Sequence, residues 1–220
     1  MKSVYIALTI TFVTSIAQAQ NFNWKWSDAQ RPHYMHVNLG YDFGFSTQLG
    51  YSYLTAGKRP LLLSLDCAIP MGETLFDDYK LRLGGQFNAI EKQNFILTAK
   101  LLGNFNRHET ELVRIQSLGI ETSVLAGYYA SKWHVAAELG LLKPYTSHLK
   151  HADVMRENFP SITDGWYTST GSYLIYGLQF GKAMTQGLDL SLRLGIPKAL
   201  NGHKDALIAR YAQIGLLKKF

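Results

Sequence analysis

Residues 79–105 read YKLRLGGQFNAIEKQNFILTAKLLGNF, an apolar run with charged residues at alternate positions. Lys80 and Arg82 alternate with Leu81 and Leu83, and the pattern resumes after the EKQN break. Successive side chains of a β-strand point to opposite faces, whereas a helix would scatter these charges around its circumference. The segment therefore predicts two strands, each with one apolar and one charged face.

The same period of two recurs about ten times after residue 33. Connections after the second, fourth, sixth and eighth predicted strands are short, and those after the third, fifth, seventh and ninth are longer, the longest spanning about 143–170. The first hairpin, at 42–44, is the exception. This pattern predicts an all-β fold, an antiparallel up-and-down transmembrane β-barrel of about ten strands, with eight remaining possible. The predicted strands are 34–42, 44–54, 61–69, 79–89, 95–105, 115–128, 133–142, 171–182, 188–196 and 207–219.

Composition agrees with this fold class. The chain has 220 residues, enough for one domain or at most two, with 47% apolar residues, 13% aromatics and 19 glycines. The formal charge of +6 is too diffuse to indicate nucleic-acid binding. Cys67 is the single cysteine, so the chain forms no intramolecular disulfide.

The N-terminus reads MKSVYIALTITFVTSIAQAQ, with an early Lys2, an apolar core and Ala17-Gln18-Ala19. This layout predicts a secretory signal peptide over 1–19, cleaved before Gln20. The alternative is a membrane anchor, but the core is shorter than the roughly 18 to 20 apolar residues of a spanning helix.

We expect residues 20–32 to form a leader and 33–220 to form the barrel. Trp24 and Trp26 allow three interpretations of the leader: it plugs the periplasmic mouth, it anchors at the membrane surface, or it is disordered.

The alternation also predicts which face meets lipid. A basic side chain facing the hydrocarbon at the bilayer midplane costs about 2 to 4 kcal/mol, so the charged face must be the interior. We predict an interior network of four acids and four bases, with small glycines relieving the crowding and a packed lumen rather than a wide pore. The predicted interior charges are Asp66, Lys80, Arg82, Lys100, Glu121, Glu138, Asp189 and Arg193. The predicted lipid-facing residues are Leu81, Leu83, Phe87, Phe95, Leu97, Ala99, Leu101, Val135, Leu139, Leu190, Leu192 and Leu194. The predicted interfacial aromatics are Tyr51, Tyr53, Tyr79, Phe105, Tyr128, Tyr129, Trp133, Tyr173 and Phe180.

The chain ends in ARYAQIGLLKKF, with Ala212, Ile214 and Leu216 on one face and a terminal Phe220. This ending resembles the terminal-aromatic signature of small bacterial outer-membrane β-barrels, although Lys218 stands where that class usually has an apolar residue. The resemblance implies location in the bacterial outer membrane, recognition by the barrel assembly machinery, and contact with outer-membrane lipid and lipopolysaccharide. No motif identifies a particular family.

Candidate functional residues lie in the predicted outer loops, because loops on a rigid scaffold carry function. His148, His151 and Asp153 are residue types that bind metals, but their spacing matches no helical metal motif, and we predict neither a metal site nor a cofactor. Ser147, His148 and Glu157 supply the residue types of a hydrolase.

We predict a structural or binding role through the extracellular loops. An outer-membrane hydrolase acting on lipid A or peptides and a narrow channel are the alternatives. The polar loops 106–114 and 197–206 offer cations for lipopolysaccharide phosphates. The candidate binding residues are Arg107, His148, His151, Asp153, Lys198 and Lys204.

Overall fold

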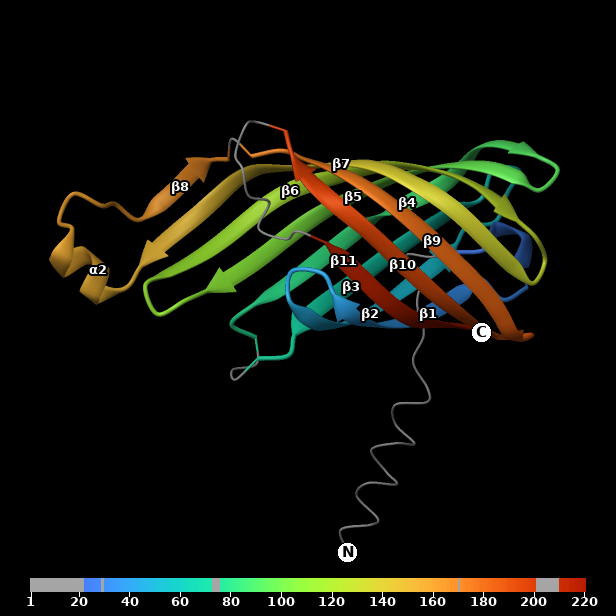
Figure 1. The fold of residues 1–220 in the computed structure, drawn as a ribbon, viewed down its shortest axis with the longest axis horizontal. Helices are drawn as coiled ribbons and strands as arrows, with labels where there is room; N and C mark the ends of the chain where they lie inside the picture. Colours follow the sequence, from blue (N-terminus) through green and yellow to red (C-terminus); the bar gives the residue numbers. More distant parts are fainter. Residues whose placement is uncertain (1–21, 29, 73–75, 170, 201–209) are drawn as a thin grey trace, which may run out of the picture.

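The computed structural model describes residues 22–28, 30–72, 76–169, 171–200 and 210–220, and most of them lie in antiparallel strands (Figure 1). Eleven strands belong to one sheet, in which β8 pairs only with β7. The other ten pair in a continuous ring, in which β1 meets β11 and β6 meets β7. The predicted ten-stranded antiparallel barrel is confirmed, and the eight-stranded alternative is wrong.

The ring runs β1–β2–β3–β4–β5–β6–β7–β9–β10–β11. None of the described helices is long and apolar enough to cross a membrane. The elements are η1 (Trp24–Trp26), β1 (His33–Tyr41), β2 (Phe45–Leu54), β3 (Leu61–Pro70), β4 (Tyr79–Lys92), β5 (Phe95–Glu109), β6 (Val113–Tyr129), β7 (Trp133–His151), α2 (Asp153–Asn158), β8 (Gly165–Thr168), β9 (Tyr173–Thr185), β10 (Leu188–Ala199) and β11 (Tyr211–Lys219).

The two ends of the barrel differ in their connections. At one end, which we call the turn end, residues 93–94 and 186–187 link strands tightly and the C-terminus lies close by (Figure 1). At the opposite end, the loop end, the connections include 71–78 and 152–172. The longest connections therefore lie at the loop end, as predicted. The 42–44 hairpin is the predicted exception, and the β5–β6 connection, predicted to be long, is a second one because only 110–112 separate these strands.

Strands extend further into the predicted loops than the sequence pattern indicated. β7 continues to His151 within the predicted 143–170 loop, which also contains α2 and β8. In the predicted 106–114 loop only 110–112 are outside strands, and β10 takes in the start of the 197–206 loop. The ladder continues because backbone pairing needs no apolar face, whereas the alternation signal vanishes once both faces meet water. The signal peptide and the predicted start of the last strand, residues 207–209, lie outside the described residues.

The outer surface of the barrel carries large apolar side chains. Leu83 is 65% exposed, Phe95 66% and Ile214 60%. Apolar side chains are exposed on strands all around the ring, which is far more than a water-soluble monomer tolerates. This band is the surface that faces hydrocarbon in a transmembrane barrel.

Aromatic rings mark both margins of the band, as interfacial girdles do. Tyr128 stacks on Trp133 near the turn end, and Tyr79 contacts Phe105 nearer the loop end. The prediction that Tyr129 belongs to the girdle is wrong. Tyr129 is buried inside the barrel and stacks on His134. Its inward position follows from alternation with its outward neighbour, Tyr128.

Interior rings lie directly against glycines of neighbouring strands. A Cβ at Gly195 would lie 2.2 Å from the Cζ of Tyr211, and one at Gly177 would lie 2.3 Å from its hydroxyl oxygen. Rings covering strand glycines fill the space left by the missing side chain and hold the register. The same arrangement occurs in the paired residues His36–Gly50 and His134–Gly181.

We predict that Gly195→Ala destabilises the barrel by about 1 to 3 kcal/mol, because the new methyl group displaces a buried ring and also approaches the carbonyl oxygen of Tyr176. Gly103→Ala is the matched control, since its nearest contact would be ordinary, at 3.6 Å from the carbonyl oxygen of Leu83. Urea unfolding followed by tryptophan fluorescence measures both variants. Equal midpoints for the two would contradict the role of the ring contact.

Candidate functional site

The barrel interior holds a buried cluster centred on Glu138 of β7. Its carboxylate lies 2.8 Å from Lys100 Nζ and 3.0 Å from Arg193 Nη2, and it accepts a 2.8 Å hydrogen bond from Gln179 Nε2. Glu121 lies 3.2 Å from the same lysine nitrogen. The partners come from β5, β6, β9 and β10, so one carboxylate joins strands that are not neighbours in the ring.

A second cluster fills the side of the lumen formed by β1 to β4. Asp66 accepts hydrogen bonds from Arg82 Nε at 2.8 Å and from Gln48 Nε2 at 3.0 Å. Lys80 Nζ lies 3.2 Å from Asp42 Oδ2 in the β1–β2 hairpin. The two clusters together pair four acids with four bases inside the wall.

All eight predicted interior charges are buried, but they do not join one network. Seven belong to the two clusters, whereas Asp189 lies apart near the turn end and forms no ion pair within the described residues. Asp42 takes the place of the fourth acid. Sequence reasoning assigned Asp42 only to a turn, although its position directly after β1 carries it into the lumen.

Amides also belong to these clusters and were missed by a search restricted to charged residues. Gln179 and Gln48 each donate to a cluster carboxylate, and Asn38 donates to Gln48 Oε1 at 2.9 Å. The signal was present, since Gln179 lies between Leu178 and Phe180, Asn38 lies between Val37 and Leu39, and Gln48 precedes Leu49.

The turn end of the lumen is filled by the N-terminal segment. Phe22, Trp24 and Trp26 are buried among residues of the barrel wall, including Tyr34 and Leu217. Phe22 contacts the Tyr34 ring edge-on, with centroids 5.0 Å apart. Of the three interpretations of the leader, the structure shows the plug.

Polar contacts fasten this plug to the barrel. Lys219 Nζ donates to the carbonyl oxygen of Trp26 at 3.1 Å and lies 4.2 Å from its ring centroid. Lys25 forms a 2.6 Å ion pair with Glu91 of β4. The plug thus contacts two strands of the barrel, β11 and β4.

A lobe projects at the loop end, formed by residues 145–169 with the end of β7, α2 and β8 (Figure 1). His151 and Arg156 both contact Asp164, at 2.9 and 3.2 Å. Hydrogen bonds from the backbone N–H and the ring of His151 hold the pKa of Asp164 below its usual range. We call residues 145–169 the loop-end lobe.

The predicted loop candidates are scattered rather than gathered. Arg107 pairs with Glu109 on its own strand, and Asp153 pairs with Arg156 in α2. His148 contacts Trp166 edge-on, and Lys198 is exposed on β10. Lys204 lies outside the described residues.

The candidate hydrolase residues do not form a catalytic arrangement. The Ser147 hydroxyl lies 2.8 Å from that of Ser117, while His148 is the next residue of the strand and faces the opposite side. Within the described part of the chain, no group of three His, Cys, Asp or Glu side chains is placed to hold a metal ion.

Charged clusters inside, an apolar band outside and an even number of antiparallel strands occur together in one class of protein. The chain folds as an outer-membrane β-barrel.

No protein-family profile and no curated protein matches its sequence. Among solved structures, it is similar to OmpTdeltaL8, a loop L8 deletion mutant of the Vibrio cholerae outer membrane protein OmpT, with a TM-score of 0.28 and 11% identity. The match covers 79% of this chain and 63% of that chain, so the chain spans less than two thirds of the length of that structure.

We predict opposite outcomes for two buried acids. Glu138→Ala leaves Lys100 and Arg193 without their shared partner and should cost about 3 to 5 kcal/mol. Asp189→Asn removes a charge that has no ion-pair partner among the described residues and should cost less than about 1 kcal/mol.

Heat-modifiable electrophoretic migration and urea unfolding of the two folded variants test this difference. Equal losses would show that the Glu138 cluster contributes no more than an isolated buried acid. Arg193→Ala provides an independent check and should also lower stability.

Proposed function

We propose that the protein is a non-conducting outer-membrane barrel that presents the loop-end lobe to a protein partner outside the cell. The orientation follows the rule that short turns of such barrels face the periplasm and long loops face outward. The observation that carries the proposal is the lobe itself, a paired and hydrogen-bonded extension that leaves large aromatic side chains uncovered.

The lobe has the composition of a protein interface. Phe159 is 55% exposed, Trp166 60% and Tyr167 41%, and α2 buries none of its residues. Arg156 belongs to the same lobe, where it pairs with Asp153 and Asp164. Tyr, Trp, Phe and Arg are the residue types enriched at protein interfaces, and they supply most of the strongest contacts.

Backbone hydrogen bonds hold the lobe together. The Ser169 N–H donates to the Tyr145 carbonyl oxygen at 2.9 Å, and β8 pairs with β7 through four residue pairs. An ordered surface binds with a smaller entropy cost than a flexible loop. This supports recognition as the role of the lobe.

The interior supports the non-conducting part of the proposal. Ten strands enclose a lumen narrow enough for side chains to fill. Here ion-paired clusters occupy the lumen wall and the N-terminal aromatics occupy the turn end. A conducting pore needs a continuous water path between these groups.

We predict that the purified barrel gives no stable single-channel conductance in planar bilayers. Trp24→Ser combined with Trp26→Ser removes the two plug tryptophans but keeps the paired clusters, so it should also give no stable conductance. Steady openings of the unmodified protein would contradict the proposal and favour the narrow channel.

We predict that a photoreactive phenylalanine analogue placed at Phe159 or Trp166 crosslinks a discrete protein partner in intact cells. Leu83, on the lipid-facing wall, is the control position and should give no protein adduct. Trp166→Ser should weaken the adduct formed from position 159 while leaving heat-modifiable migration unchanged. Adducts to lipopolysaccharide alone, or the same protein adduct from position 83, would overturn the role of the lobe.

A further inference from the structure

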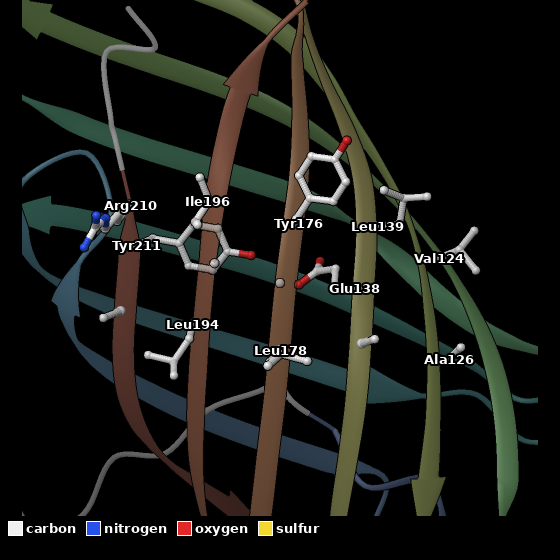
Figure 2. Close-up of a pocket in the computed structure, with 14 residues that line it drawn as sticks. Val124, Ala126, Glu138, Leu139, Tyr176, Leu178, Leu194, Ile196, Arg210 and Tyr211 are labelled. Atoms are coloured by element: carbon white, nitrogen blue, oxygen red, sulfur yellow. The ribbon is translucent and has the colours of Figure 1, made fainter.

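The outer wall of the barrel contains a groove of about 980 Å³ that crosses β6, β7, β9, β10 and β11 (Figure 2). Three alanines lie along it, Ala126, Ala137 and Ala212, with Ala126 and Ala137 directly paired across two strands. Its volume is within the range of sites that bind small molecules. The groove lies in the apolar band, so its contents come from the membrane.

Larger side chains form a wall on the loop-end side of the alanines. Ile196 pairs with Tyr176, and Tyr176 pairs with Leu139, so these three residues follow one another across the strands. Gly177 and Gly195 also line the groove, and the Tyr211 ring lies directly against both of them. The groove therefore has a rigid back and an apolar lining suited to acyl chains.

Basic residues lie at the loop-end margin of the same surface. Lys198 follows Leu194 and Ile196 on the outward face of β10, and Arg210 precedes Ala212 and lines the groove. Lys143 follows Leu139 on β7 with the same period of two. Within the described residues, none of these three cations forms an ion pair, whereas every cation of the two interior clusters does.

We propose that the groove and this basic margin bind lipid A, with acyl chains over the alanines and phosphate groups at Lys198 and Arg210. The assignment rests on the orientation given for the proposed function, because the loop end must face the outer leaflet. Lipid A is the anionic lipid of that leaflet, and it combines several acyl chains with phosphates on one headgroup. Phosphate paired with Arg or Lys forms strong charge-assisted hydrogen bonds.

The binding test uses the full-length barrel reconstituted in phosphatidylcholine vesicles containing a small fraction of bis-phosphorylated lipid A. After mild detergent extraction, native mass spectrometry counts lipid A molecules retained on each barrel. We expect lipid A to be retained by the unmodified protein. Phosphatidylglycerol at the same fraction should be retained about tenfold less, because it has one phosphate and fewer chains.

Two pairs of variants locate the site. Ala137→Phe with Ala212→Phe fills the groove and should lower retention about tenfold, whereas Ala99→Phe adds the same ring to the outer wall away from the groove and should not. Lys198→Gln with Arg210→Gln should likewise lower retention. Lys58→Gln with Arg59→Gln removes two exposed cations at the turn end and should leave it unchanged.

Equal retention of phosphatidylglycerol, or undiminished retention by the groove-filled or margin variants, would overturn the assignment. Heat-modifiable migration confirms that each variant is folded before lipid is counted. The crosslinking result from the lobe is scored separately, so a lobe without a protein partner leaves this test intact. Conversely, loss of the lipid site leaves the lobe proposal standing.

Discussion

The carboxylate of Glu138 is the contact on which the arrangement of the barrel depends most. Lipid surrounds the outer wall, so a charge on a strand can be neutralised only by another charge inside the ring. Glu138 on β7 receives Lys100 from β5 and Arg193 from β10, and each of these bases lies beyond an intervening strand. A slip of one residue in any of the three strands would turn its charge toward hydrocarbon and break its pairing at this site. The pairing therefore selects the register of half of the ring.

This requirement explains the glycines of the inner wall. Glu138 pairs in register with Gly177, and a Cβ there would lie 3.4 Å from that of Glu138 and closer still to Tyr211. The Arg193 guanidinium lies 4.7 Å from the Tyr211 ring centroid, so cation, ring and glycine form one packed unit. A narrow lumen can hold large charged side chains only where neighbouring positions are empty. The glycines are part of the charge network rather than flexible points of the strands.

The sequence predicted those parts of the fold in which one face of a strand meets lipid and the other faces the polar lumen. Within the membrane, alternation between residues such as Leu81 and Arg82 gives strand, facing and approximate register together. Beyond the membrane both faces of β7 meet water, and the segment around Ser147 gave no periodic signal although its ladder continues to His151. The sequence also could not predict which acids form ion pairs inside the lumen. Among the described residues, Asp42 is paired and Asp189 is not, and they differ in their position in the barrel rather than in residue type. The groove depends on alanines from three strands and was not visible from any one of them.

β7 connects the interior, the lipid surface and the lobe. Glu138 points into the lumen, while Ala137 and Leu139 on either side of it line the outer groove. A register shift follows between Leu118 and Gly119 of β6, where Gly119 pairs with Pro144 and Leu118 with Thr146, leaving Tyr145 as the extra residue. Such a bulge bends a strand and increases its twist, so it re-aims everything beyond it. The shift comes directly after Lys143 at the basic margin, so the lobe departs from the barrel where the lipid-facing surface ends. A lipid phosphate at that margin would lie beside the bulge. The direction in which the lobe projects depends on β7, the same strand that the interior ion pairs hold in register.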